Sequence, residues 1–183
     1  FCFNFSSYDY KLYIMSIPKI LEFYNITPNK INYINVNEEK NEYWKKRLSF
    51  NKKFKIGIVY RGLLNSFIEK YIPIKLFKYL DDLDVELICL HKKSDCENDL
   101  KDAGLTKKIT HYDIDNEKPF EDTVCILNNI DLLLSVDTYS IHLAGVMGVK
   151  SYLLLGKQTS WLWFTGTKNE FYSSVENIIM DSN

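Results

Sequence analysis

Residues 131–155 form the stretch that most restricts how this chain can fold. Leu132 to Val136 is a short, almost unbroken apolar run, which is typical of a strand buried on both faces of a parallel sheet. Ser140 to Met147 predicts a helix, and Gly148 is placed as its C-terminal stop. Lys150 to Leu155 is a second apolar run. The stretch therefore predicts a strand, a tight turn, a helix and another strand.

The turn at Asp137 and Thr138 lies at the carboxyl end of the first of these strands, under the first turn of the helix. Ligands of parallel α/β sheets bind outside the carboxyl ends of the strands. The free N–H groups and the dipole of a helix N-terminus also favour an anion. One interpretation is that a phosphate, as in a nucleotide diphosphate, binds here. The other is that Asp137 or Thr138 merely caps the helix, and the spacing leaves both open.

The same alternation continues on both sides of this stretch. Further strands are predicted at residues 54–60, 85–90, 108–112 and 175–180, and helices at 73–82, 94–103 and 120–129. The buried sides of two of these helices are expected to be Leu76, Phe77 and Leu80, and Val124, Ile126 and Leu127. Because strands alternate with helices, the sequence predicts an α/β fold with a doubly wound parallel sheet.

Residues 1–50 have the least regular pattern. Residues 16–24 predict a short helix with Pro18 in its first turn, and residues 31–36 are compatible with a strand. Glu38 to Leu48 predicts a charged helix with Tyr43, Trp44 and Leu48 on one side. The aromatic residues near the N-terminus either pack on a domain that this chain lacks or form a satellite cluster on its own core.

Composition excludes several classes of protein. The chain has 183 residues, which suits one domain, and a net charge of −1, which suggests neither a nucleic-acid partner nor an anionic membrane surface. It has no apolar run of about 18 residues, so no membrane span is expected. The cysteines, Cys2, Cys89, Cys96 and Cys125, lack the spacing of metal ligands. They are expected to be buried or incidental thiols in a reducing compartment, the cytoplasm.

Residues 135–148 (SVDTYSIHLAGVMG) resemble the SVDTxxxHLAGxxG signature of a family of glycosyltransferases. The family comprises the ADP-heptose:lipopolysaccharide heptosyltransferases and glycosyltransferase-like domains that follow tetratricopeptide repeats. Other segments resemble its motifs in the same order: residues 55–62 (KIGIVYRG) resemble IGLVWSG, 71–74 (YIPI) SIPL, 120–123 (FEDT) DFADTA, and 153–155 with 160–163 (LLL, SWLW) LLP…DWRW. The resemblance covers roughly residues 10 to 178.

This resemblance implies the Rossmann-like C-terminal half of a glycosyltransferase of the GT-B type, with residues 51–183 as the nucleotide-sugar-binding domain. Residues 1–50 would be an interdomain or linker segment that packs on it. The donor would be a nucleotide-diphosphate sugar carrying a hexosyl or heptosyl group, no metal cofactor is expected, and the acceptor would be a glycan, lipid or protein. The missing N-terminal domain would supply the catalytic base, so we expect no turnover from this chain alone.

The resemblance also suggests residues that bind the donor. It places Lys70 at a phosphate and His142 near the phosphate or sugar. The residues alone favour an ordinary surface lysine at position 70, and they leave open whether His142 is a hydrogen-bonded structural histidine. Gly62 would let the backbone approach a ligand, and Tyr139 and Ser140 begin the helix over the phosphate. Asp137 is expected to organise the turn rather than to act as an acid or base.

Two more candidates follow the strand that ends at Leu155. Lys157 lies near the predicted crevice, and Trp161 and Trp163 match the paired aromatics of the family. Trp161 would either form a wall for the base or sugar or pack in the core, whereas Trp163 is expected to pack in the core. His91 and His111 are expected to be structural or surface residues.

Several positions depart from the family pattern. Ser160 and Leu162 stand where the family has Asp and Arg, Leu63 and Leu64 replace Asn-Pro, and Tyr60 and Arg61 replace Trp and Ser. Of these, Ser160, Leu162 and Leu63 favour the alternative function, a degenerate, non-catalytic binding or scaffold domain of the same fold. The retained Asp137-Thr138, His142 and Gly62 favour the glycosyltransferase. A Rossmann oxidoreductase is disfavoured, because the first strand of the sheet runs into Tyr60-Arg-Gly-Leu-Leu without G-x-G-x-x-G.

Overall fold

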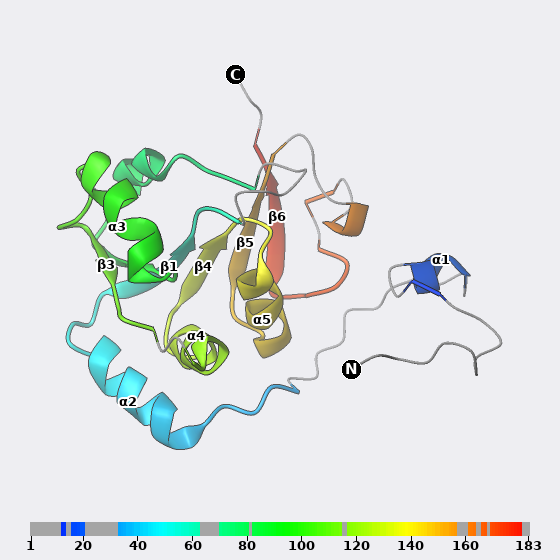
Figure 1. The fold of residues 1–183 in the computed structure, drawn as a ribbon, viewed down its shortest axis with the longest axis horizontal. Helices are drawn as coiled ribbons and strands as arrows, with labels where there is room; N and C mark the ends of the chain where they lie inside the picture. The colour runs from blue at the N-terminus through cyan, green and yellow to red at the C-terminus, as the bar shows by residue number, and fades with distance from the viewer. Residues whose placement is uncertain are drawn as a thin grey trace.

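A computed structural model describes residues 12–13, 16–20, 33–62, 70–80, 82–114, 117–156, 161–163, 166–167 and 169–180. Its centre is a six-stranded sheet in the order β3-β2-β1-β4-β5-β6, and every neighbouring pair is parallel. The strands are β1 (Phe54–Val59), β2 (Val85–Cys89), β3 (Ile109–His111), β4 (Leu132–Ser135), β5 (Ser151–Leu155) and β6 (Val175–Ile179). The predicted doubly wound parallel sheet is confirmed (Figure 1).

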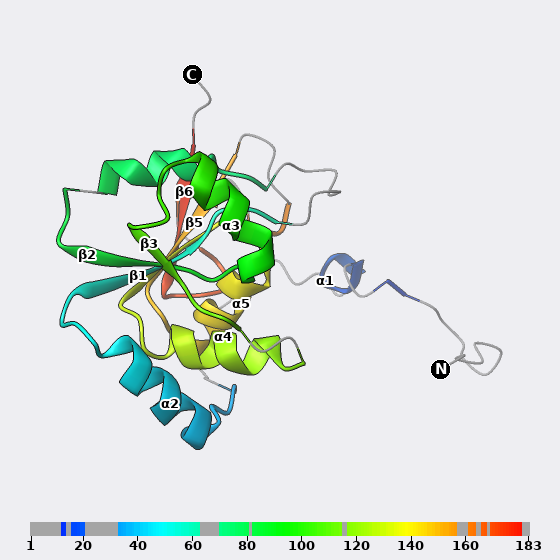
Figure 2. The same ribbon diagram turned by 60° about the vertical axis from the view of Figure 1, so that its left-hand side comes forward.

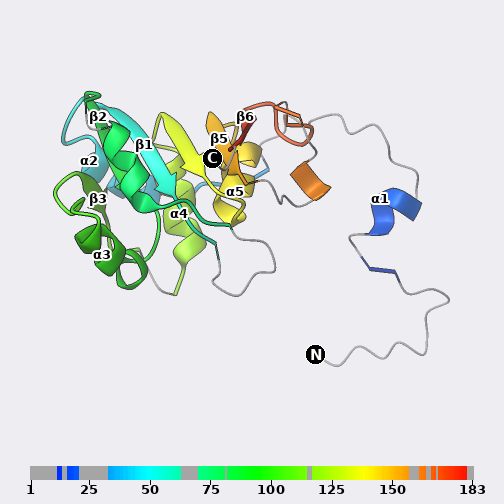
Figure 3. The same ribbon diagram turned by 90° about the horizontal axis from the view of Figure 1, so that it is seen from above.

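The strand order places β1 and β4 side by side at the centre of the sheet, although they are far apart in sequence. From β1 the chain moves outward to β2 and β3, and it then returns to β4 and continues to β5 and β6 on the other side. Figure 3 shows the two halves, with β1 and β2 toward one end and β5 and β6 toward the other. The reversal between β1 and β4 is the topological switch point, where this class of sheet forms its ligand crevice.

Helices cover both faces of the sheet. The helices of the described chain are α1 (Ile17–Ile20), α2 (Glu38–Leu48), η3 (Ile74–Leu80), α3 (Lys93–Asp102), α4 (Pro119–Leu127), α5 (Tyr139–Met147) and η4 (Trp161–Trp163), and α1 lies apart from the sheet (Figure 1). Figure 2 shows η3 and α3 on one face, and α2, α4 and α5 on the other. Each face has its own buried apolar cluster, since residues of α2, α4 and α5 form one cluster and those of η3 and α3 form the second.

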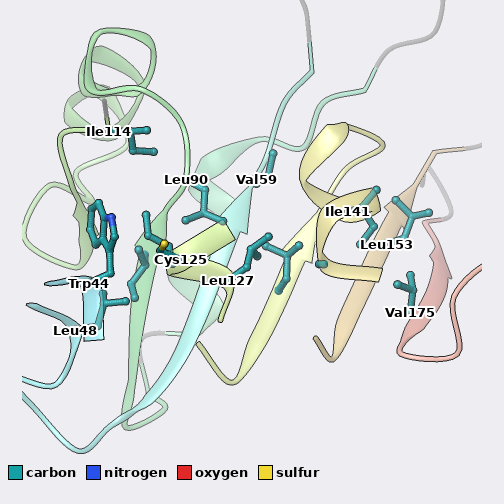
Figure 4. Packing of buried hydrophobic residues seen from close by; sticks show 14 of the residues in the cluster. Trp44, Leu48, Val59, Leu90, Ile114, Cys125, Leu127, Ile141, Leu153 and Val175 are labelled. Atoms are coloured by element: carbon teal, nitrogen blue, oxygen red, sulfur yellow. The ribbon is translucent and has the colours of Figure 1, made fainter. Parts of the chain in front are cut away.

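The cluster on the α4 and α5 side extends from Trp44 to Val175 (Figure 4). Trp44 and Leu48 are buried in it, as predicted for this side of α2. The Trp44 Nε1 donates a hydrogen bond to the Asp122 carboxylate over 2.7 Å, which ties α2 to α4. Because this bond is buried, it satisfies two polar groups that would otherwise destabilise the core. The helix before residue 50 therefore packs on the sheet domain, while the proposed boundary at residue 50 stays a prediction.

Two predictions about buried faces and one about a strand were wrong. Tyr43 is 54% exposed, and its hydroxyl instead accepts a hydrogen bond from Arg47. Leu76 is 42% exposed, because residues 74–80 form a 3-10 helix, whose three-residue turn aligns Ile74, Phe77 and Leu80. Residues 33–36 form no strand, because they run along α4 and α5 rather than along a sheet edge; residues 31–32 lie outside the described residues.

Two further predictions are confirmed in the described residues. Gly148 ends α5 in the left-handed conformation with φ 73°, which a residue with a side chain adopts only with strain. Cys89, Cys96 and Cys125 are buried free thiols, whereas Cys2 lies outside the described residues. Among the residues that the structure describes, none of the helices has the length and apolar character that crossing a membrane requires.

Candidate functional site

A cavity of about 670 Å³ opens at the carboxyl ends of β1, β2 and β4. It lies over the switch point, as the strand order predicts. Residues at or beyond the ends of these strands line it, together with Ile114 beyond β3: Val59, Arg61, Gly62, Lys70, Leu90, His91, Lys92, Asp95, Ile114, Asp137, Thr138, Tyr139 and Ser140. Charged groups from three strand ends therefore meet around one opening.

Most of the predicted site residues come together in this cavity. Gly62, Lys70, Asp137, Thr138, Tyr139 and Ser140 all line it. His142 does not belong to its lining. Lys157 lies outside the described residues, and Trp161 belongs to η4 without a described side chain. The cavity thus brings Gly62 and Lys70 together with residues 137–140, which are remote from them in sequence.

Lys70 reaches the cavity through a short antiparallel pairing beyond β1. The Gly62 amide donates to the Lys70 carbonyl over 2.7 Å, and the Ile72 amide donates to the Tyr60 carbonyl over 2.8 Å. The Nζ of Lys70 then lies 2.7 Å from Oδ2 of Asp137. This ion pair links the chain after β1 to the turn after β4.

Gly62 lies against the stem of Lys70. A Cβ atom at Gly62 would meet the Lys70 Cβ at 3.1 Å and its Cδ at 3.4 Å. These contacts are tighter than normal packing, so a side chain at residue 62 would press on Lys70. The absence of a side chain at Gly62 therefore helps to place the Lys70 ammonium at the cavity.

The start of α5 has no side-chain cap. Thr138 is the N-cap residue, with extended backbone, and its side chain makes no capping hydrogen bond; its Oγ1 lies 3.4 Å from the Ser135 hydroxyl instead. The Asp137 carboxylate is paired with Lys70. Among the described residues, no group accepts a hydrogen bond from the amides of Tyr139 and Ser140. The helix thus presents free N–H groups to the cavity, where they favour a negative charge.

His142 belongs to a different face of α5. Its Nδ1 lies 3.0 Å from the Tyr172 hydroxyl, and its ring stacks on Trp163 with centroids 4.9 Å apart. Burial lowers the pKa of His142, and the nearby Lys70 lowers it further, while Asp137 opposes them. Trp163 is buried, as predicted. In this structure His142 has the contacts of a packed, hydrogen-bonded histidine.

The glycine in the HLAG segment explains how Tyr172 reaches His142. A Cβ atom at Gly145 would lie only 2.3 Å from the Tyr172 ring. That space is therefore filled by the tyrosine, whose hydroxyl pairs with His142. His142 and Gly145, both part of the HLAG motif, therefore help to pack the segment before β6 against α5.

The structure adds cavity residues that the sequence interpretation missed. His91, predicted to be structural or superficial, lines the cavity with Leu90 and Lys92. Its position could have been found by the rule that served for Asp137, since each lies two residues beyond the carboxyl end of its strand, β2 or β4. Ile114, which follows β3, is buried and contributes an apolar wall.

Tyr60 and Arg61, two departures from the family pattern, share a partner on α3. The Tyr60 hydroxyl donates to Asp99 over 2.6 Å, and Arg61 Nη1 lies 3.5 Å from the same carboxylate. Arg61 also donates to the Asp95 carbonyl. Burial and the bond to Asp99 raise the pKa of Tyr60. Both residues therefore attach the end of β1 to α3 at the rim of the cavity.

The other departures contribute less to the described structure. Leu162 is partly buried and packs against the apolar cluster on the α5 side of the sheet. Ser160, Leu63 and Leu64 lie outside the described residues. Among the residues that are described, no group of three or more His, Cys, Asp or Glu side chains is arranged to hold a metal ion.

Comparison with known proteins identifies the fold. No family model matches the sequence, and a search of curated proteins finds no match. The chain is similar to the ADP-heptose lipopolysaccharide heptosyltransferase II of E. coli, with a TM-score of 0.57 and 15% identity over 82% of this chain and 46% of that one. It is also similar to a family 9 glycosyl transferase of Veillonella parvula, with a TM-score of 0.60 and 14% identity over 90% of this chain and 47% of that one.

A glycosyltransferase of Rickettsia africae is similar as well, with a TM-score of 0.51 and 12% identity over 81% of this chain and 39% of that one. The chain therefore spans less than half of the length of these three structures. Sheet order and structural similarity agree on the architecture. The chain has the Rossmann-like α/β fold of heptosyltransferase-like glycosyltransferases.

Proposed function

We propose that this chain is the donor-binding part of a glycosyltransferase that uses a nucleotide-diphosphate sugar. The diphosphate would bind between Lys70 and the start of α5. The main support for this proposal is the position of the Lys70 ammonium, which lies 2.7 Å from Asp137. Asp137 immediately precedes the start of α5, which has no side-chain cap. A cation and free amides at a switch-point crevice form a site suited to phosphate.

The proposed chemistry assigns separate tasks to these groups. Transfer of the sugar breaks its bond to the diphosphate, so negative charge develops on the leaving oxygen. Lys70 and the amides of Tyr139 and Ser140 would stabilise that charge. Asp137 would hold Lys70 in place before the phosphate arrives and would share it afterwards. These groups supply positive charge without a metal, and we therefore expect binding to persist in EDTA.

The acceptor's proton must pass to a base, and we propose that this base belongs to a part of the enzyme outside this chain. The chain spans 46% and 47% of two similar glycosyltransferase structures, which supports a partial enzyme. We expect nucleotide binding but no sugar transfer by this chain alone. Because the E. coli enzyme is described by the substrate ADP-heptose, ADP is one candidate nucleotide, alongside UDP and GDP.

Calorimetric titration with UDP, ADP, GDP and their sugars tests the proposal. Saturable binding of one nucleotide is expected, and Lys70→Ala should weaken it about tenfold or more, since hydrogen bonds to charged groups contribute about 1.5–3 kcal/mol. Thr138→Trp should abolish it by filling the cavity. Lys150→Ala is a matched control, because this lysine lies outside the cavity lining. Sugar transfer by this chain alone would contradict the proposal that the catalytic base lies outside this chain.

A second candidate is a non-catalytic binding or scaffold domain with the same fold. The ion pair between Arg61 and Asp99 favours it. Arg61 stands where the family pattern has Ser, and in this chain it joins β1 to α3 in a structural role. A folded protein that binds no nucleotide at millimolar concentration would favour this alternative. Selective nucleotide binding that depends on Lys70 would favour the glycosyltransferase.

A further inference from the structure

His91 occupies the β2 side of the cavity in a fixed orientation. The Tyr60 amide donates a hydrogen bond to its Nε2 over 3.2 Å. The two rings meet edge to face, with centroids 4.6 Å apart and an interplanar angle of 72°. The backbone that leaves β1 therefore determines how the imidazole is turned.

This contact also determines which nitrogen carries the proton. A neutral imidazole has one donor and one acceptor nitrogen. Since Nε2 accepts from Tyr60, the proton lies on Nδ1. Burial, reinforced by the Arg61 charge, lowers the pKa of His91 to about 4, against the opposing effects of Asp95 and Asp99. The ring is consequently neutral near pH 7.

The Nδ1–H group is available to a ligand. No described residue accepts a hydrogen bond from it. The Nδ1 atom is also not fully buried, so a ligand can reach it. His91 itself lines the cavity. The imidazole thus offers a neutral donor whose direction is fixed before a ligand binds, which lowers the entropic cost of binding.

The surroundings of His91 differ from the phosphate end of the cavity. Val59, Leu90 and Ile114 are buried apolar residues that line the same cavity. Lys70 and Asp137 lie by the β4 turn, and β4 is separated from β2 by β1. Two strand spacings amount to about 10 Å, which a diphosphate and its nucleoside can span. An apolar wall with one fixed donor suits a heterocyclic base.

We propose that His91 is a specificity-determining residue that donates a hydrogen bond from Nδ1 to an acceptor atom on the nucleotide base. Val59, Leu90 and Ile114 cover the faces of the base. This inference rests on the proposed function, because it assumes that the diphosphate binds beside Lys70. It predicts a preference among nucleotides according to the acceptor that each base presents to His91.

His91→Gln isolates the donor. The Gln carbonyl oxygen can accept from the Tyr60 amide in place of Nε2. The Gln NH2 group is then attached beyond the δ carbon, whereas His Nδ1 is bonded to the γ carbon, so the donor at the Nδ1 position is lost. The probes are inorganic pyrophosphate and whichever of UDP, ADP and GDP the unmodified protein binds most tightly. We expect nucleotide affinity to fall about five- to tenfold, as for one lost neutral hydrogen bond, with pyrophosphate affinity and melting temperature unchanged. His111→Gln, outside the cavity lining, should change none of these.

The outcomes separate this inference from the proposed phosphate site. Unchanged nucleotide affinity in His91→Gln, or an equal loss for pyrophosphate, would overturn the role of His91. If His91→Gln weakens nucleotide binding while the unmodified protein does not bind pyrophosphate and Lys70→Ala has no effect, the base site holds and the phosphate site fails. A folded protein that binds neither probe overturns both. His91→Phe, which removes both hydrogen bonds, should reduce stability as well as nucleotide affinity.

Discussion

The Nζ of Lys70 and the Oδ2 of Asp137 lie 2.7 Å apart, although the residues belong to segments on opposite sides of the switch point. Their side chains are 28% and 12% exposed, so the pair is partly shielded from water. Shielding strengthens an ion pair relative to one on the surface. A phosphate entering the cavity must therefore compete with Asp137 for the same ammonium group.

This competition predicts that Asp137→Asn strengthens the binding of a simple anion. The substitution removes one negative charge and frees Lys70, so pyrophosphate affinity should rise about threefold to tenfold at low salt. The gain should shrink as ionic strength increases, because salt screens the added charge. Calorimetry at two salt concentrations measures both effects. Weaker binding in this variant would mean that Asp137 is needed chiefly to position Lys70.

Gly62→Ala should weaken anion binding through Lys70. The added methyl group would press on the Lys70 Cβ, which a Cβ at residue 62 meets at 3.1 Å. The ammonium would shift by a few tenths of an ångström, and we expect affinity for pyrophosphate to fall about two- to fivefold, a part of what a charged hydrogen bond contributes. The same titration measures this. Unchanged affinity would show that the lysine stem adapts without moving its charge.

Gly145→Ala should reduce stability, because its Cβ would overlap the Tyr172 ring at 2.3 Å. Overpacking of this kind costs about 1–3 kcal/mol, measurable by urea unfolding. Gly156→Ala is the matched control, since a Cβ there meets no atom within 4 Å. An equal free energy of unfolding for Gly145→Ala and the unmodified protein would contradict the close packing of Tyr172 on α5.

His91 makes stability depend on pH. Its pKa falls from the ordinary value of 6.5 to about 4 in the folded protein, so the folded state binds fewer protons than the unfolded state between these values. The free energy of unfolding should therefore fall as the pH drops from 6.5 toward 4, by up to about 3 kcal/mol from this residue. The lowered pKa of His142 acts in the same direction.

Urea unfolding at pH 7 and pH 4.5 measures this effect in the unmodified protein and in His91→Gln. The loss of stability between the two pH values should be smaller in the variant, because Gln does not titrate. An identical loss in both proteins would show that other groups, such as His142, govern the acid response.

The sequence predicted the elements of this fold better than the details of its surfaces. Apolar runs and helix ends located every strand of the sheet within a few residues, because these signals are local. The exposure of Leu76 and Tyr43 was not predictable in the same way. It depends on whether a turn is 3-10 or α and on which neighbour a helix meets, and both are set by tertiary packing.

In the candidate site, too, features set by local sequence were predicted and features set by tertiary packing were not. Asp137 and Thr138 were identified because one continuous segment contains the strand, the turn and the helix. His91 was missed because its importance comes from the strand order, which places β2 beside β1 and brings His91 to the Tyr60 amide. The partner of His142 could not be predicted either, since Tyr172 follows 30 positions later in an irregular segment.

Backbone amide NMR during titration with pyrophosphate tests the central claim most directly. The account predicts saturable shifts at Tyr139, Ser140 and Gly62, which should be much smaller in Lys70→Ala at the same subsaturating concentration. The shifts should be absent from a second cavity at the opposite end of the sheet, which is lined by Lys45, Lys52 and Lys53 among others. Shifts confined to those lysines, or no shift in a folded protein at millimolar pyrophosphate, would contradict a phosphate site at the start of α5.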